Sequence, residues 1–532
     1  MKARLETNPR QARVGTSAET TPTRTFCVAH QIAVREQTVQ IAPAAVPHLT
    51  PAPSIMRAAL LASFALMCAT SAERANAQSA TESNATAALL QELIRVNTSN
   101  PPGNEEQLAN LLAPRFKALG FEITIIPTPQ AGKAHFIARL RGDGSKKPLL
   151  IAAHADVVGV EREKWTVDPF AGVAKDGSIY GRGAIDFKGG MAVFARAAMM
   201  LAEQKIPLAR DVIFMAEADE EGAPYNTTWL SKDHFDKIDA EFALNEGGWI
   251  IKDAKGKTQY VSISTADKSS VALVLTARGT STHSSMPRPD QAIFTLSKAM
   301  AKLADYETAV QLTASTKQFF STLAETSAPP MSQYFRDLVS GTKAKQHAAD
   351  KIISKDPLLH AIMRNTYAPV LMNAGFRSNV IPGSAEATVN VRTIPGTSPA
   401  VIIAELTRVV NDPRVEIKLA STPATAAAVA ASVNVVPKIL ESPTNTELYR
   451  ALEREAKAQY PGARVTPYLF QAGTDAAAWR SRDIPVYGIY PYAISADELT
   501  RMHGNDERVS IESLRQGTDM IFRTLVSVAG KH

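Results

Sequence analysis

Cysteine is nearly absent from this 532-residue sequence, and its two cysteines, Cys27 and Cys68, both precede residue 78. A chain that began at residue 78 would contain no disulfide, no thiolate metal ligand and no cysteine nucleophile. Any metal ion would then have to be bound by histidine and carboxylate side chains.

An excess of charge is also lacking once the N-terminal region is set aside. The formal net charge is +6, but the first 77 residues hold eight Lys/Arg and four Asp/Glu, which leaves 50 basic against 48 acidic residues. No broad basic field remains, which argues against nucleic acid as a partner. With 45% apolar and 21% charged residues, the composition is that of a globular protein, not of a disordered chain or a polytopic membrane protein.

Long apolar runs are missing too, apart from one short segment near the N-terminus. Residues 1–55 lack periodicity, so we expect them to be disordered or to form a leader upstream of a true start at Met56. The run AALLASFALMCAT follows; it has the length of a signal-peptide core and is too short to span a bilayer. A small-x-small pattern ends at Ala77. We therefore predict a signal peptide over residues 56–77 and a periplasmic or secreted mature protein; the alternative is an apolar segment beside a disordered tail.

Alternating helical and strand-like patterns indicate the fold class of the remaining chain. Helical spacing over residues 105–119 is followed by strand-like runs at 149–153 and 211–216, with a helix at 189–201 between them. The run at 149–153 is apolar on both faces, as a central strand covered by helices would be. The pattern predicts an α/β domain with a mostly parallel central sheet flanked by helices.

A change of pattern near residue 266 predicts a second, α+β unit. It contains strand-like runs, amphipathic helices and a long helical stretch whose packing the sequence does not determine, and it ends near the Ala-rich residues 422–432. The α/β pattern then resumes. We therefore predict a discontinuous catalytic domain, residues 85–265 and 433–532, with an inserted lid or dimerisation-type domain, residues 266–432.

The first candidate site residues, His154 and Asp156, follow the buried run at 149–153. Alternate residues of a strand share a face, so both side chains should point into the crevice beyond its carboxyl end. Imidazole binds divalent metals, and a carboxylate on the other ring nitrogen fixes its tautomer. Taken alone, a histidine at a strand end is more often structural.

A glycine-rich segment at residues 181–190 nearly matches the GxGxxG dinucleotide fingerprint, but Asp186 occupies the sixth position. A carboxylate there would repel a pyrophosphate, so nucleotide binding is disfavoured. Flexible backbone around a carboxylate that bridges two cations explains the glycines better.

Further carboxylates follow later strand-like runs. Asp219, Glu220 and Glu221 stand together, and such a triplet alone is usually a solvated acidic turn. Adjacent side chains diverge, however, so one Glu can bind a metal while its neighbour acts as general base. Glu246 and His503 lie after further strand-like or loop segments and supply two more candidate ligands.

The order His-x-Asp, Asp, Glu-Glu, Glu, His resembles that of the M20 metallopeptidases, which include glutamate carboxypeptidase, aminoacylase-1, acetylornithine deacetylase and succinyl-diaminopimelate desuccinylase. The resemblance runs roughly from residue 87 to the C-terminus and includes the inserted domain. It implies a zinc-peptidase-type domain with two Zn²⁺, for which Co²⁺ or Mn²⁺ could substitute.

The resemblance also implies individual roles. One zinc would be bound by His154, Asp186 and Glu246, and the other by Asp186, Glu221 and His503. Glu220 would be the general base, and Asp156 would orient His154. In the family another residue usually separates the acidic pair from a glycine, whereas here Gly222 follows directly.

Further matches concern the lid and the substrate. The segment at residues 279–287 resembles the family's lid motif, which implies that His283 stabilises the developing oxyanion, across a homodimer interface in dimeric members. Two other segments imply that Asn379 and Arg392 contact substrate, and Gly473 and Thr474 resemble a loop near the substrate's carboxylate. Without the resemblance these residues would be taken as a surface His, a turn Asn and a strand-edge Arg.

The segment at residues 165–170, with the extended lid, looks most like the carboxypeptidase S and N-acyl-amino-acid hydrolase branch. This implies hydrolysis of peptides or N-acyl amino acids with a free C-terminal carboxylate, with Glu220 activating a water between the metals. One alternative is a biosynthetic N-acyl deacylase of the acetylornithine or diaminopimelate class, which an export signal disfavours. Another is a non-catalytic binding protein on the same fold, which would have lost ligands that this chain retains.

Overall fold

The computed structural model describes residues 85–222, 224–421, 432–435, 438 and 440–531. The predicted leader (1–55), the predicted signal peptide (56–77) and both cysteines lie outside the described residues. Within those residues, no helix has both the length and the apolar character needed to cross a membrane.

The larger α/β part begins with a helix that includes residues 85–95. Its other elements before the inserted segment are α2 (Glu105–Ala118), β1 (Glu122–Pro127), β2 (Ala134–Leu140), β3 (Leu149–His154), β4 (Val173–Lys175), β5 (Ser178–Tyr180), α3 (Lys188–Glu203), β6 (Val212–Glu217), α4 (Thr227–Asp233), α5 (Phe235–Ile238), β7 (Phe242–Asn245), β8 (Ile250–Lys252) and β9 (Thr258–Asp267). After the inserted segment follow α13 (Glu447–Gln459), β16 (Arg464–Phe470), α14 (Ala477–Arg480), β17 (Val486–Gly488), β18 (Ala493–Ile494), α15 (Ala496–Leu499), β19 (Arg508–Ser510) and α16 (Ile511–Ala529).

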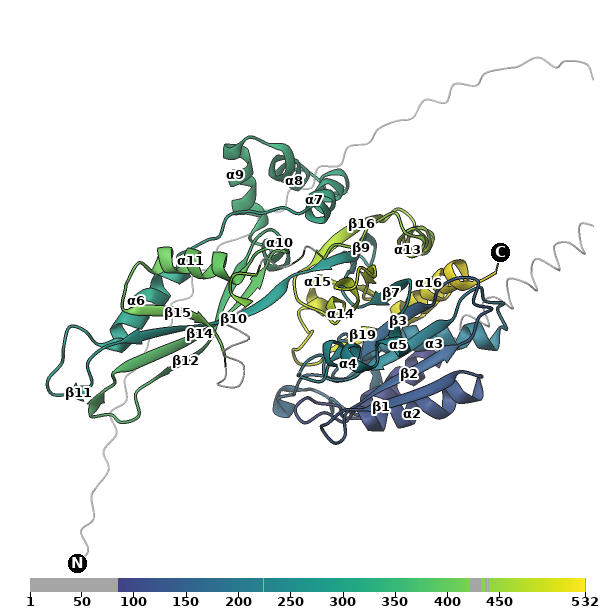
Figure 1. Cartoon of the computed structure of the whole chain (residues 1–532). Helices are drawn as coiled ribbons and strands as arrows, with labels where there is room; N and C mark the ends of the chain where they lie inside the picture. Colours follow the sequence, from purple (N-terminus) through teal and green to yellow (C-terminus); the bar gives the residue numbers. More distant parts are fainter. Residues whose placement is uncertain (1–84, 223, 422–431, 436–437, 439, 532) are drawn as a thin grey trace, which may run out of the picture. The chain divides into compact units, whose positions relative to one another are not determined.

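These strands form a mixed sheet in the order β1-β2-β6-β3-β7-β17-β9-β8-β18, with β16 paired to β9 (Figure 1). The central pairs β6–β3, β3–β7 and β7–β17 are parallel. The α/β class with mostly parallel central strands and flanking helices is therefore confirmed.

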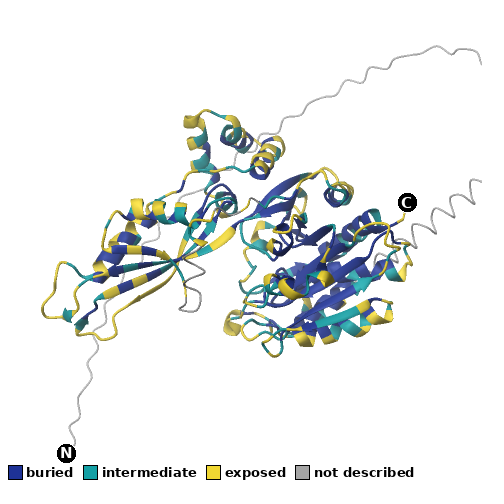
Figure 2. Cartoon of the chain, viewed as in Figure 1, coloured by how far each residue is buried: buried dark blue, intermediate teal, exposed yellow. Residues whose placement is uncertain are grey.

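Alternate side chains of β3 enter two different hydrophobic cores, one on each face of the sheet. Leu149 and Ile151 join the core that includes α2, α3 and α16, whereas Leu150 and Ala152 join a second core with α4 and α14. All six residues of β3 are buried, as Figure 2 shows for the central strands. A strand between two helical layers needs apolar residues at consecutive positions, which is what the sequence has.

The inserted segment contains β10 (Ser269–Arg278), β11 (Thr282–His283), α6 (Ala292–Ala304), α7 (Ala314–Thr326), α8 (Met331–Ser340), α9 (Lys343–Ile353), α10 (Pro357–Ile362), β12 (Thr366–Ala374), β13 (Val380–Ile381), β14 (Ser384–Thr393), α11 (Pro399–Val410) and β15 (Val415–Leu419). Four strands form an antiparallel sheet in the order β12-β14-β10-β15. α6 and α11 cover one face and share a separate core with it. This part has the expected α+β composition.

Helices α7 to α10 pack elsewhere. Phe319 of α7 lies against Tyr260 of β9 and Tyr468 of β16, with ring centroids 5.5 and 5.2 Å apart. The apolar residues of these helices belong to the core of the mixed sheet, not to the core beneath α6 and α11. The predicted inserted range, 266–432, therefore contains two packing groups.

Candidate metal centre

Three neighbouring parallel strands end at the same edge of the mixed sheet and supply most of the site. His154 is the last residue of β3, Glu246 follows β7, and Glu220 and Glu221 follow β6. The carboxyl edge of such a sheet is where ligands bind in open α/β folds. Asp186 comes from the loop before α3, and His503 from the loop between α15 and β19.

The five predicted ligands converge around Asp186. His154 Nε2 lies 3.1 Å from Asp186 Oδ1 and 3.5 Å from Glu246 Oε2. His503 Nε2 lies 3.1 Å from Asp186 Oδ2 and 2.8 Å from Glu221 Oε1. The two imidazoles thus face opposite oxygens of one carboxylate, and each has a second carboxylate beside it.

This donor set fits two divalent metal ions. Ligand atoms that surround a tetrahedral metal at about 2.0–2.2 Å stand about 3.3–3.6 Å from one another. The contact of 3.5 Å lies in this range, and those of 2.8 and 3.1 Å are shorter, so the side chains would move apart slightly around an ion. Two groups of the described residues, His154–Asp186–Glu221 and His154–Glu220–Glu246, place their ligand atoms close enough to hold a metal ion; both contain His154, and neither is one of the two ligand sets that the resemblance implies. Nitrogen and carboxylate donors without thiolates suit zinc, cobalt or manganese.

Charge crowding at the site shows in its pKa values. Burial raises the pKa of Glu246 to about 7, since it outweighs the lowering effect of His154. Burial, followed by repulsion from Glu246, raises the pKa of Glu220 well above its usual range. Hydrogen bonds to Asp186 and Glu221 raise the pKa of His503 to about 10. Positive charge between these groups would relieve the repulsion.

Asp156 does more than the sequence predicted. His154 Nδ1 donates to the backbone carbonyl of Asp156 at 2.9 Å, whereas the Asp156 carboxylate lies farther away, at 3.7 Å. That carboxylate instead accepts the backbone N–H groups of Glu220 (3.1 Å) and Glu221 (2.9 Å). Asp156 therefore fixes the histidine tautomer through its main chain and the acidic loop through its side chain.

Two residues that we did not predict from the sequence, Tyr490 and Glu507, form hydrogen bonds with the candidate ligands or with the backbone that carries them. The Tyr490 hydroxyl lies 3.0 Å from Asp186 Oδ1 and 2.9 Å from Glu246 Oε2. Glu507 is fully buried, pairs with Arg182 at 2.6 Å, and accepts the backbone N–H groups of residues 183, 185 and 186 at 2.7 to 3.1 Å. In the sequence Glu507 stands close to His503, but no local pattern indicates that it contacts Arg182 and the backbone before α3.

His135 also supports the acidic loop, although the sequence assigned it no role. It is fully buried in β2. Its Nδ1 accepts the Ala218 N–H at 3.2 Å, and its Nε2 donates to the Tyr225 carbonyl at 2.9 Å. The ring therefore joins both ends of the loop that carries Glu220 and Glu221.

The predicted substrate residues fall into two groups. A Cβ added at Gly473 would lie 3.8 Å from a guanidinium nitrogen of Arg392, and Gly473 and Thr474 line a cavity of about 510 Å³ together with Lys268 and Arg480. The next residue, Asp475, is buried and accepts from Thr227; burial raises its pKa to about 6. The charge of His154 acts in the opposite direction and lowers the pKa of Asp475.

His283 and Asn379 form the second group. In the ribbon β11–β13 His283 pairs with Val380, and the Ser284 N–H donates to the Asn379 carbonyl at 3.0 Å. The exposed His283 ring contacts Ser285 at 2.8 Å. Among the described residues, no hydrogen bond or ion pair joins His283 or Asn379 to the ligand cluster.

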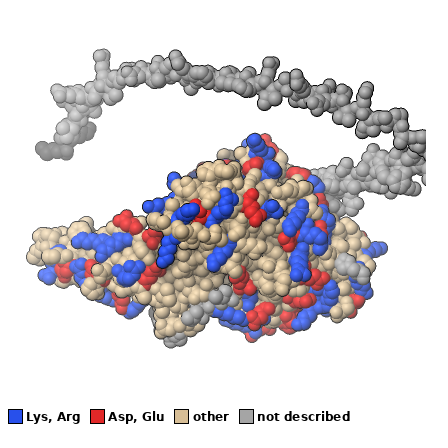
Figure 3. All heavy atoms as spheres, turned by 90° about the horizontal axis from the view of Figure 1, so that it is seen from above, with Lys and Arg blue, Asp and Glu red and all other residues tan. Residues whose placement is uncertain are grey.

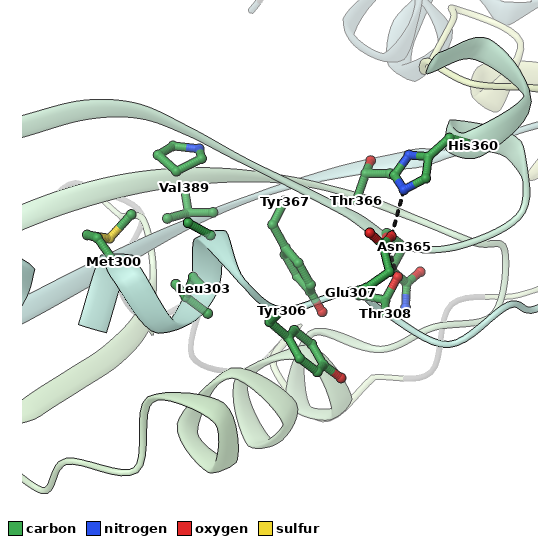
Figure 4. A pocket seen from close by; sticks show the side chains of 12 residues that line it. Met300, Leu303, Tyr306, Glu307, Thr308, His360, Asn365, Thr366, Tyr367 and Val389 are labelled. Atoms are coloured by element: carbon green, nitrogen blue, oxygen red, sulfur yellow. Dashed lines mark hydrogen bonds and ion pairs between the residues drawn. The ribbon is translucent and has the colours of Figure 1, made fainter. Parts of the chain in front are cut away.

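Another cavity, of about 290 Å³, lies between the end of α6 and the start of β12 and contains none of the predicted site residues (Figure 4). His360 reaches Glu307 at 2.6 Å in this cavity. Lys/Arg and Asp/Glu side chains are interspersed over the molecular face in Figure 3, in keeping with the near-balanced charge of the sequence.

The family model of peptidase family M20/M25/M40 matches residues 150–527. A probable carboxypeptidase S-like protein 2 from Dictyostelium discoideum is 30% identical over 390 residues, covering 72% of each chain. The human N-fatty-acyl-amino acid synthase/hydrolase PM20D1 is 27% identical over 398 residues, covering 74% of this chain and 76% of its own. The M20 metallo-carboxypeptidase Sso-CP2 from Sulfolobus solfataricus has a similar fold, with a TM-score of 0.59, 18% identity, and coverage of 82% of this chain and 98% of that chain.

The fold and the convergent ligands define a metallohydrolase. The chain belongs to peptidase family M20/M25/M40, because the family model covers more than half of its length. The family predicted from the order of the site residues is thus confirmed.

Proposed function

We propose that this protein is a two-metal amide hydrolase that acts on peptides or N-acyl amino acids with a free C-terminal carboxylate. The observation that carries the proposal is the position of Asp186, whose two carboxylate oxygens each lie 3.1 Å from a different imidazole. A carboxylate that faces one histidine with each oxygen can bridge two metal ions, and two neighbouring ions can assist hydrolysis.

When bound, two zinc ions would polarise the scissile carbonyl and make the attacking water more acidic. Glu220 lies beside Glu246 and His154, where its carboxylate can take a proton from the attacking water. The same carboxyl then returns this proton to the leaving nitrogen. The bonds from Asp156 to the Glu220 and Glu221 N–H groups keep the base and the adjacent ligand in place.

The substrate assignment rests on the cavity beside Gly473. Arg392 offers a guanidinium next to this glycine, and guanidinium groups bind carboxylates in bidentate fashion. The names of two relatives, carboxypeptidase S-like and N-fatty-acyl-amino acid synthase/hydrolase, also fit a substrate whose released half is an amino acid.

The test is amino acid release by the zinc-loaded protein from a panel of dipeptides and N-acyl amino acids, with a chelator-treated control. Chelator-sensitive release is expected, and the preferred substrates define the acyl and amine halves. N-acetylornithine and N-succinyl-diaminopimelate belong in the panel, because release from these two alone would favour the biosynthetic alternative. Zinc binding without release from any member would contradict the substrate proposal, and failure to bind metal would favour the binding-protein alternative.

We further propose that a second copy of the chain pairs along β12 and that His283 serves the partner's site as an oxyanion stabiliser. β12 is an edge strand, and Val370, Leu371 and Met372 on it are 56–60% exposed (Figure 2). An apolar edge of this kind favours strand pairing with another chain. Sedimentation of the wild type should show a dimer, and Leu371→Lys should shift it to monomer; an unchanged dimer would refute this interface.

Export is a separate proposal, supported by the apolar run after Met56 and the cleavage pattern that ends at Ala77. N-terminal sequencing of the protein recovered outside the cytoplasm should give Gln78 as the first residue. A chain retained inside with residues 56–77 intact would refute it.

A further inference from the structure

The loop of residues 218–222 and 224–225 carries both the proposed base and a proposed ligand, so its conformation matters to the whole site. Asp219 has a left-handed backbone, with φ of 68°, a conformation that is uncommon for non-glycine residues, among which aspartate adopts it more often than most. Its carboxylate accepts the Tyr225 N–H at 2.7 Å across the loop. The described loop is fastened to the rest of the protein by Asp156, His135 and the contacts of Asp219.

Asn100 connects these fastening points. Its Nδ2 donates to Asp156 Oδ2 at 2.8 Å and to Asp219 Oδ1 at 2.7 Å. Its Oδ1 accepts from the buried Lys133 ammonium at 2.9 Å, and its backbone N–H donates to the Val157 carbonyl at 2.8 Å. Both side-chain N–H groups and the side-chain carbonyl of Asn100 are therefore used, and Asp156 and Asp219 each accept one of the two N–H groups.

Gly222 completes the arrangement. A Cβ at this position would lie 2.2 Å from Asn100 Nδ2 and 2.5 Å from Asn100 Cγ. A side chain at position 222 would therefore push the Asn100 amide aside and break its hydrogen bonds. This close approach accounts for the glycine directly after the acidic pair, where the family pattern usually has another residue.

We propose that Asn100 is a positioning residue that fixes Glu220 and Glu221 through Asp156 and Asp219, and that Gly222 is the partner its position requires. The proposal rests on the proposed two-metal function for its effect on turnover. Asn100 touches neither ligand nor base by side chain, and it acts by holding the loop in one conformation.

The first test compares Asn100→Ala and Asn100→Asp with the control Asn104→Ala. Asn104 lies in the same segment, and its side chain donates to Gln107 and to no other residue in the described part of the chain. In Asn100→Ala we expect zinc affinity at one of two sites, that of Glu221 and His503, to fall about 10–100-fold, with a similar fall in kcat and little change in KM. Asn100→Asp should lose more zinc affinity and more kcat than Asn100→Ala. It keeps the volume of the side chain but places a third carboxylate between Asp156 and Asp219.

These variants separate positioning from packing. If Asn100 only filled space, the Asp variant would be milder than the Ala variant, which would overturn the proposal. The metal-free proteins give a readout that does not depend on the two-metal function, because Asn100→Ala should speed hydrogen exchange of the peptide with residues 218–222 while Asn104→Ala should not. Unchanged exchange in Asn100→Ala would also overturn the proposal.

The second test uses Gly222→Ala, which covers the case in which the Asn100 variants fold poorly. Alone, it should reproduce the faster loop exchange and the selective loss of one metal. Combined with Asn100→Ala it should add little, because the clashing amide is gone and the bonds are already lost. Fully additive effects would refute the Asn100–Gly222 partnership, whereas a wild type that binds no metal yet shows the expected exchange pattern would refute only the proposed function.

Discussion

Acid should destabilise this protein through His135, a residue outside the metal centre. Burial lowers the pKa of His135 to about 4, although hydrogen bonding to the Tyr225 carbonyl and the nearby charges of Asp156 and Asp219 oppose the shift. In the unfolded chain the pKa of His135 has its ordinary value near 6.5. Between pH 6.5 and 4 the unfolded state therefore binds a proton that the folded state does not.

The sign and size of the effect follow from proton linkage. Because the unfolded state holds more protons in this interval, the free energy of unfolding falls as pH falls, and above pH 6.5 the contribution is constant. The gap between pKa values of 6.5 and about 4 corresponds to about 3 kcal/mol when the pH has fallen through the whole interval. Protonation would also remove the Nδ1 acceptor of the Ala218 N–H, so the acidic loop should loosen with it.

The assay is urea unfolding of metal-free protein at several pH values between 4 and 7.5, for the wild type, His135→Gln and His347→Gln. His347 is exposed on α9, so its variant should keep the wild-type pH dependence. His135→Gln should be less stable at pH 7 but should lose about 3 kcal/mol less than the wild type on acidification. Parallel curves for the wild type and His135→Gln would refute the reasoning.

Three further predictions concern the site itself. Glu220→Gln should keep its metal content and fold but lose about 10²- to 10⁴-fold in kcat, and near-normal turnover with bound metal would contradict its role as base. Glu507→Gln should lower the free energy of unfolding by about 3–5 kcal/mol in urea, because it leaves the Arg182 guanidinium buried without a counter-charge; unchanged stability would contradict the pairing. Zinc at 100 times its dissociation constant should add about 2.7 kcal/mol per site to the unfolding free energy, which calorimetry with and without chelator measures, and an unchanged melting temperature would count against metal binding by the folded chain.

The sequence indicated in part that the candidate ligands meet, because His154, Glu221 and Glu246 end or follow strands of one sheet, whereas Asp186 and His503 lie in loops. The run before His154 has no polar residue for five positions, which marks a strand covered on both faces and places its last residue at the sheet edge. The same reasoning placed the carboxylates after β6 and β7. When several strand-like runs are each followed by a candidate ligand, these side chains are expected to lie close together at the carboxyl edge of the sheet.

Packing partners were less predictable. The helices between residues 314 and 362 show apolar faces in the sequence, but amphipathicity says only that a face is buried and not what covers it. Phe319 finds its partners on β9 and on β16, the latter about 150 residues later in the chain. The periodicity of a helix does not identify its packing partner, so the sequence predicted the inserted range as one unit, although helices α7 to α10 join the core of the mixed sheet.

The polar residues that support the acidic loop, such as Asn100, were the least predictable from the sequence. Gly222 shows how one of these contacts could have been anticipated. Asn100 is 119 residues from Asp219, which it contacts, and an asparagine in an Asn-Pro-Pro-Gly stretch ordinarily indicates a turn. The sequence did, however, contain a trace of the contact, since the glycine stood one position early beside the acidic pair. A backbone position that must be glycine without needing a left-handed φ indicates that another group lies where the Cβ would be. A displaced glycine beside a predicted ligand pair is therefore a reason to search for a side chain that packs onto it, and here that search leads to the residue that holds the loop.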